Sequence, residues 1–183
     1  MELIETKPKT YDDYAKLPEG AAYQLIGGEI IMVPAPDLYH QDILGNIYDE
    51  MRRVVRSKKL GRVYVAPADV YFGEHDTFQP DIVFVSNERM NILKGKRIEG
   101  APDIVIEILS PSTGYYDLAH KKDVYEEFGV KEYWIVDPKV RSIEVLENVN
   151  GKFTTHTKLK KKGAVSSKVP PDFTLDLDTI FEV

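Results

Sequence analysis

The chain has 183 residues, of which 43% are hydrophobic and 30% are charged, and its formal net charge is -6 at pH 7. This length and composition fit one soluble globular domain, residues 1–183, that can bury a core of its own. The absence of cysteine excludes disulfides and thiolate metal sites, and the net charge argues against a strongly basic coat for nucleic acid. No apolar run is long enough for a signal peptide or a membrane span, so we expect a cytoplasmic protein without a membrane partner.

The first half of the chain is predicted to hold a hairpin, a long helix and three short strands. A short helix capped by Thr10 precedes YQLIGGEIIMVP, which is typical of a hairpin turned at Gly27-Gly28. From about Tyr39 to Lys58, apolar residues recur at helical spacing and predict an amphipathic helix with a basic outer face. The strands are RVYVA, ADVYF and DIVFV.

The second half is predicted to alternate strands with one helix. NERMNILKGKRIEGAP is polar, and we expect a loop with one helical turn. A buried strand within PDIVIEILSPST leads to a helix from about Tyr116 to Phe128, which Gly129 ends. EYWIV is a further strand, SIEVLEN and KFTTHTKL form a hairpin around VNG, and the last segment adds a strand or a helical turn. These elements predict an α/β or α+β fold with a central sheet flanked by helices.

The strand in PDIVIEILSPST carries a carboxylate among apolar residues. Glu107 alternates with Val105 and Leu109 on one face, while the isoleucines occupy the other face. Burying an unpaired charge costs several kcal/mol. Glu107 therefore either reaches water at a strand edge or bulge, or faces a partner.

The helix after this strand carries a lysine on its apolar face. At roughly 100° per residue, Lys121 lies near the centre of the apolar arc. It could snorkel to solvent along its stem, or pair with Asp117 one turn earlier. The apolar members of the arc are Leu118, Val124, Tyr125 and Phe128.

A second carboxylate, Asp81, opens the strand DIVFV directly after Pro80, which by itself is ordinary turn chemistry. Two carboxylates on neighbouring strands can bind a hard cation such as Mg²⁺, with Mn²⁺ as an alternative. A lysine at the same place supplies charge for a developing phosphate anion, or helps to position and deprotonate a water. Together, Asp81, Glu107 and Lys121 predict attack on a phosphodiester.

Three segments resemble the Uma-two family of restriction endonucleases, which is assigned to the PD-(D/E)XK nuclease superfamily: QPDIVFV, GAPDIVIEILSPST and DLAHKKDVYEEFGVKEYWIVDP. The upstream segment YQLIGGEIIMVPAPDLYHQDI also matches, so the resemblance runs from about Tyr11 to the C-terminus. It implies a restriction-endonuclease-like core with a central mixed β-sheet, an N-terminal hairpin and a C-terminal hairpin.

The resemblance also implies roles for single residues. Asp81 matches the family's metal-binding aspartate, and Glu107 matches the glutamate of its E-x-K element. The third position of that element is Leu109 here, and Lys121 occupies the place to which the lysine has moved. Independently of the resemblance, the backbone carbonyl of Ile106 or Ile108 could serve as an extra oxygen ligand of the metal.

Two upstream residues match further family positions. Glu29 corresponds to an acidic position that could hold a metal or water, although an exposed hairpin residue is equally consistent. His40 corresponds to a helix histidine, which could be catalytic, structural or part of a helix cap. Gln24 departs from the glutamate that is frequent in the family, and GYYD after Ser112-Thr113 replaces arginines that would contact the DNA backbone. Ser112 and Thr113 are interpreted as a helix cap.

Three functions are consistent with these residues. The first is a Mg²⁺-dependent DNA endonuclease, expected to be a homodimer because cutting both strands commonly uses two active sites. The second is a catalytically silent nuclease fold that acts as a binding or regulatory module. The third is a metal-dependent phosphoesterase acting on RNA or nucleotides. Basic side chains that could contact phosphate occur in three runs, although each such run is more often a solvated face: Arg52 to Lys59, Lys94 to Arg97 and Lys158 to Lys162.

Overall fold

The computed structural model describes residues 7–18, 20, 22–110 and 115–182, except for the side chains of residues 115–117. Its centre is a mixed sheet with the strand order β12-β11-β10-β9-β6-β3. Strands β9 and β10 are parallel, and the other neighbours are antiparallel. The strands are β3 (Gly61–Val65), β6 (Ile82–Ser86), β9 (Ile104–Ile108), β10 (Glu132–Asp137), β11 (Ser142–Val149) and β12 (Lys152–Lys160).

A second sheet, formed mainly by the N-terminal part of the chain, has the order β2-β1-β5-β4-β8-β7. Its first pair is the predicted hairpin, in which both turn glycines adopt positive φ (56° for Gly27 and 80° for Gly28). That conformation suits a tight turn between twisted strands. The strands are β1 (Tyr23–Ile26), β2 (Glu29–Met32), β4 (Val70–Gly73), β5 (Asp76–Phe78), β7 (Leu93–Lys94) and β8 (Arg97–Glu99).

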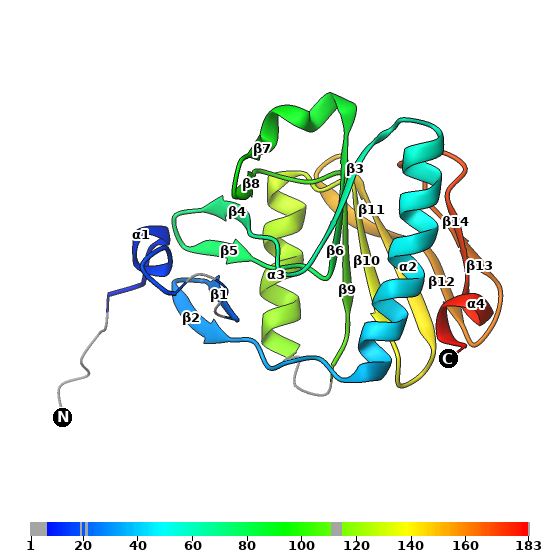
Figure 1. Ribbon diagram of the computed structural model, residues 1–183, viewed down its shortest axis with the longest axis horizontal. Helices are drawn as coiled ribbons and strands as arrows, with labels where there is room; N and C mark the ends of the chain where they lie inside the picture. Colours follow the sequence, from blue (N-terminus) through cyan, green and yellow to red (C-terminus); the bar gives the residue numbers. More distant parts are fainter. Residues whose placement is uncertain (1–6, 19, 21, 111–114, 183) are drawn as a thin grey trace.

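Helices cover both faces of the central sheet. Figure 1 shows α3 and the N-terminal sheet on one side of it, and α2 and α4 on the other. The helices are α1 (Tyr11–Tyr14), α2 (Leu38–Ser57), α3 (Tyr115–Phe128) and α4 (Leu177–Phe181), and η1 (Asn87–Ile92) is a 3₁₀-helix. A small hairpin of β13 (Ala164–Ser166) and β14 (Thr174–Asp176) precedes α4.

The two faces of the central sheet are buried in two hydrophobic clusters. Ile104, Ile106 and Ile108 of β9 pack in the cluster formed with α2 and α4. Val105 packs in the cluster that contains Tyr125 of α3 and residues of the N-terminal sheet. Because successive side chains alternate across a strand, the residue at position 107 belongs to the side of α3. The fold thus places Glu107 in a covered layer.

The predicted fold class and the main elements are confirmed, including the central mixed sheet, both hairpins and the helices that flank the sheet. In the second sheet, the β1–β2 hairpin and β4 were predicted, but β5, β7 and β8 were not, because strands of two or three residues leave no readable alternation. The stretch expected to be a loop contains η1 and the β7–β8 pair, and the C-terminal segment contains both β14 and α4. Among the described residues, no helix is long and apolar enough to cross a membrane.

Candidate active site

Glu107 is a buried carboxylate near the end of β9, on the face that α3 covers. β10 pairs with β9 at Glu107 itself, β6 pairs with it as far as Ile106, and Lys121 and Tyr125 of α3 cover the side chain. Only 8% of the residue is exposed, and the facing Lys121 is exposed by 7%. The strand therefore neither opens to water at Glu107 nor bulges there.

Two donors on α3 hold one oxygen of this carboxylate. The Lys121 Nζ lies 3.0 Å from Glu107 Oε1, and the Tyr125 hydroxyl donates a hydrogen bond of 2.7 Å to the same oxygen. Lys121 and Tyr125 are four residues apart, so they lie on one face of the helix. The lysine therefore does not snorkel to solvent. The side chain of Asp117, its alternative partner, lies outside the described residues.

Aromatic rings surround this pair. The Tyr125 ring contacts Phe78 and Tyr133, with centroid separations of 5.7 and 5.1 Å. The Lys121 Nζ lies 5.7 Å from the centroid of the Phe78 ring. In such surroundings electrostatic interactions are stronger than in water. The rings thus strengthen both the attraction between Lys121 and Glu107 and any field that they exert on a bound anion.

Asp81 lies across from Glu107 on the neighbouring strand. It immediately precedes β6, and the antiparallel register pairs Ile82 with Ile106, so the next residues outward are Asp81 and Glu107. Asp81 Oδ2 accepts a hydrogen bond of 2.7 Å from the Ile108 backbone N–H. This bond fixes the Asp81 side chain beside the C-terminal end of β9.

His40 reaches the same edge from the other face of the sheet. It lies in the first turn of α2, where its backbone N–H donates to the Asp37 carboxylate at 2.8 Å, and that carboxylate caps the helix. Its side-chain Nε2 lies 3.4 Å from Asp81 Oδ1. Its Nδ1 is buried and has no hydrogen-bond partner among the described residues. The structure thus brings Asp81, Glu107, Lys121 and His40 together.

Burial and charge perturb the pKa values of these groups. Burial raises the pKa of Glu107, and the negative charge of Asp81 adds to this, while Lys121 and the Tyr125 hydrogen bond oppose it. Burial, together with the charge of Glu107, raises the pKa of Tyr125 well above its usual range. For His40, burial lowers the pKa, but the hydrogen bond and charge of Asp81 outweigh it and leave the pKa raised.

The donors at this edge fit a hard divalent cation. Asp81 and Glu107 are oxygen ligands whose mutual repulsion a cation would relieve, and Glu107 Oε2 has no hydrogen-bond partner in the part of the chain that is described. The Ile108 carbonyl lies beside His40 at the same place. No three Asp, Glu or His side chains of the described residues gather closely enough to hold an ion by themselves. That set suits Mg²⁺, which commonly takes one or two carboxylates and completes its shell with water and substrate phosphate.

The other predicted positions lie apart from this cluster. Glu29 is exposed on β2 and makes no contact with Asp81 or Glu107 among the described contacts. Gln24 is buried on β1, where its side-chain oxygen accepts from the Gln79 backbone N–H at 3.0 Å. The predicted Ser112-Thr113 cap lies outside the described residues. Tyr125 was predicted only as an apolar residue, since tyrosine fits an apolar stripe without revealing where its hydroxyl points.

Comparison with known proteins identifies the family of this chain and a solved structure with the same fold. The family model described as "Putative restriction endonuclease" matches residues 10–178. The chain belongs to this family, Uma-two. A solved structure with a similar fold is described as a putative nuclease belonging to DUF820 from Anabaena variabilis. Its TM-score is 0.80 at 24% sequence identity, and the match covers 95% of this chain and 98% of that chain. A search among curated proteins finds no match.

Proposed function

We propose that this Uma-two protein is a Mg²⁺-dependent endonuclease that hydrolyses phosphodiester bonds of DNA. The observation that carries the proposal is the buried Glu107–Lys121 pair, which lies across from Asp81 at one edge of the central sheet. Membership of a family described as restriction endonucleases supports the reaction class.

Asp81, Glu107 and the Ile108 carbonyl would hold the ion. A Mg²⁺ bound there would polarise a phosphoryl oxygen and lower the pKa of an attacking water. Asp81 is oriented for this role by the Ile108 N–H, and Glu107 by Lys121 and Tyr125. Because one oxygen of Glu107 takes both donors, its other oxygen is left for the ion.

Lys121 supplies positive charge beside the scissile phosphate. Its ammonium is held by the Glu107 carboxylate and lies over the Phe78 ring. It therefore needs little reorganisation when negative charge develops on the phosphate. The same group can orient the attacking water. His40 would act on the opposite side by holding Asp81 in place.

The test is a substrate panel with the purified chain in Mg²⁺ or in EDTA. Supercoiled plasmid, linear DNA, RNA and mononucleotides would be incubated with wild type and with Asp81→Asn. The proposal expects nicking of DNA in Mg²⁺ by wild type only. Hydrolysis confined to RNA or nucleotides would replace DNA as the substrate. Absence of any Mg²⁺-dependent hydrolysis would contradict the enzyme and favour a silent binding module.

We further propose that two copies act together, since one site per copy would serve each DNA strand. Sedimentation equilibrium should give the mass of a dimer, alone or with DNA. A monomer under both conditions would contradict this.

A further inference from the structure

A cluster of basic side chains lies at the end of the central sheet where β9 and β10 finish, which is also the end that carries the candidate active site. It lines a pocket of about 480 Å³, formed by the turns that follow β10 and β12. We call it the turn cluster, and its members are Lys139, Arg141, Lys160 and Lys161.

Strand pairing relates the turn cluster to the site. A continuous row of paired residues crosses the sheet from Glu107 on β9 to Lys158 on β12. Lys160 lies two residues farther along β12, in the direction in which β9 ends. With strands about 4.8 Å apart and about 3.3 Å per residue along them, the backbones of Lys160 and Glu107 are roughly 16 Å apart. The turn cluster and the candidate active site thus lie at the same end of the central sheet.

The charges of the turn cluster are not neutralised within the protein. Lys158, their neighbour on β12, pairs with Glu144 at 2.7 Å, but none of the four has an acidic partner among the described residues. The carboxylate of Asp137 lies in the same turn and accepts from the backbone N–H groups of Lys139 and Val140. Four cations against one carboxylate leave the pocket basic, on a chain whose net charge is -6.

The backbone joins the two turns into one surface. The Lys161 N–H donates to the Arg141 carbonyl at 2.7 Å, which links the turn after β12 to the turn after β10. Both residues have positive φ, 52° for Arg141 and 70° for Lys161. Glycine or asparagine is the usual residue in this conformation. Long cationic side chains thus occupy positions where the backbone alone would favour other residues.

We propose that the turn cluster binds backbone phosphates of duplex DNA next to the phosphodiester that is cut. The inference rests on the proposed function and adds where the substrate lies. Exposed Lys and Arg that neutralise phosphates bind DNA by releasing counterions, without reading its sequence. The separation of roughly 16 Å corresponds to about five base-pair steps of 3.4 Å. The cluster would therefore hold DNA that flanks the scissile bond.

The test measures how DNA binding depends on salt. A fluorescent duplex would be titrated in EDTA, where no cleavage occurs, with wild type and with the variant Lys139→Gln/Arg141→Gln/Lys160→Gln/Lys161→Gln. Since each phosphate contact contributes about 0.9 to the slope of log K against log salt, the variant should lose about 3 to 4 of that slope. Its affinity at low salt should fall at least about tenfold.

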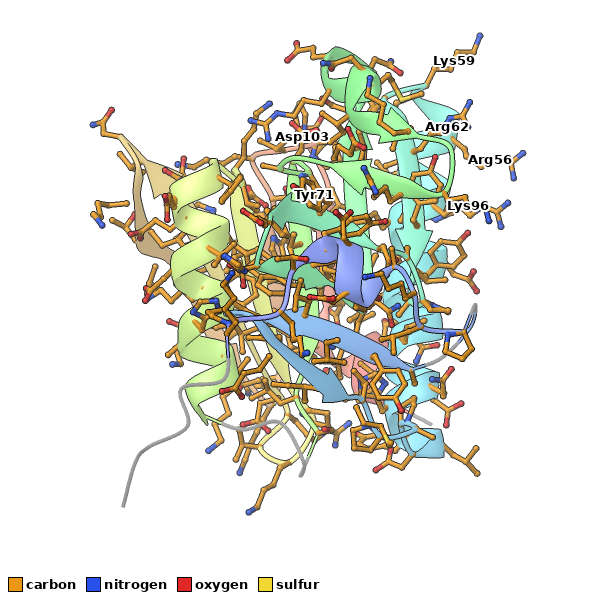
Figure 2. The ribbon with its side chains drawn as sticks, turned by 90° about the vertical axis from the view of Figure 1, so that its left-hand side faces the viewer. Arg56, Lys59, Arg62, Tyr71, Lys96 and Asp103 are labelled. Carbon is orange, nitrogen blue, oxygen red and sulfur yellow. The ribbon has the colours of Figure 1, made fainter. Side chains whose placement is uncertain are left out.

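A matched control removes the same charge elsewhere. Figure 2 labels Arg56 at the C-terminal end of α2, Lys59 in the turn that follows and Arg62 on β3. Arg56 and His40 lie near opposite ends of α2, roughly 24 Å apart at 1.5 Å per residue. The control is Arg52→Gln/Arg56→Gln/Lys59→Gln/Arg62→Gln, in which Lys59 also has positive φ. The slope of log K against log salt for this control should differ from that of wild type by no more than about one.

Three results would overturn the proposal: an unchanged slope in the turn-cluster variant, an equal loss in the control, or no DNA binding by wild type. If the fourfold variant does not fold, the single variants Lys139→Gln and Lys160→Gln replace it. Each should lower the slope of log K against log salt by about one. Failure of the proposed function looks different. Wild type would then bind DNA with the expected slope and still cut none in Mg²⁺.

Discussion

At the scale of single residues, the Tyr125 hydroxyl is one of two donors to a buried carboxylate. It donates at 2.7 Å to Glu107 Oε1, and both residues are buried. Tyr125→Phe removes this charge-assisted hydrogen bond and should lower the free energy of unfolding by about 1.5–3 kcal/mol. Mg²⁺ binding should be retained, because Lys121 still holds the same oxygen at 3.0 Å. Urea unfolding would check the loss of stability and calorimetric titration the retained binding, and an unchanged free energy of unfolding would contradict the assigned role.

The buried Glu107–Lys121 ion pair is needed for the proposed activity, but we expect it to lower the free energy of unfolding. Removing one partner, as in Lys121→Met, leaves an uncompensated charge and should cost about 3 kcal/mol or more. Glu107→Gln/Lys121→Met removes both charges and should be at least as stable as wild type at neutral pH, while losing activity. Urea unfolding at neutral pH compares the three proteins. A double variant that is clearly less stable than wild type would contradict the expectation.

The same comparison predicts a dependence on pH. Burial raises the pKa of Glu107 above its ordinary value of 4.5, so the folded state holds this proton more tightly than the unfolded state. Glu107 therefore favours folding below pH 4.5, and this contribution is lost as the pH rises through the raised pKa. The stability of wild type relative to the double variant should fall over that window.

The sequence reveals some site residues better than others. The sequence pattern by itself reveals a charged residue at a position where apolar residues are expected, and this is how Asp81, Glu107 and Lys121 could be predicted. Tyr125 could not, since its apolar ring satisfies the same pattern and only the fold shows where the hydroxyl points. The distance of Glu29 from the cluster could not be predicted either, because it depends on how the second sheet, which includes the N-terminal hairpin, packs against α3 and the central sheet.

At the scale of elements, the start of α2 positions a side chain of the site. The Asp37 carboxylate accepts from the His40 backbone N–H at 2.8 Å, which fixes the turn that directs His40 toward Asp81. Asp37→Ala should cost about 1 kcal/mol of stability and reduce the cleavage rate. Asp42→Ala, an exposed change of equal charge on the same helix, should stay within about 0.5 kcal/mol of wild type. Equal effects of the two variants in urea unfolding and plasmid nicking would contradict this role.

Elements were predictable in proportion to their length. The helix α2 shows five turns of periodicity, and the strands of the central sheet show clear apolar runs, so both were found. Strands β5, β7 and β8 have only two or three residues and are held by their neighbours in the second sheet. Such strands carry no local signal, because their pairing depends on tertiary contacts.

At the scale of the whole molecule, two hydrophobic clusters share one sheet. Trp134 and Tyr133 are neighbours on β10 and face opposite clusters, so each cluster rests on the same strands. Glu132 links the β13–β14 hairpin to this sheet, because its carboxylate accepts hydrogen bonds from the Ser167 hydroxyl and from the Lys168 backbone N–H. We therefore propose that residues 1–183 form one domain, and calorimetry should show a single unfolding transition. Two resolved transitions would contradict a single domain.

The measurement that most directly tests the account is a Mg²⁺ titration with plasmid nicking followed in parallel. Wild type, Asp81→Ala, Glu107→Ala and Lys121→Ala would be compared. Both carboxylate variants should lose metal binding, Lys121→Ala should retain it, and all three should lose nicking. Wild type that binds no Mg²⁺ or Mn²⁺ and cuts no DNA would contradict the account, and Glu107 would then be a buried structural pair with Lys121.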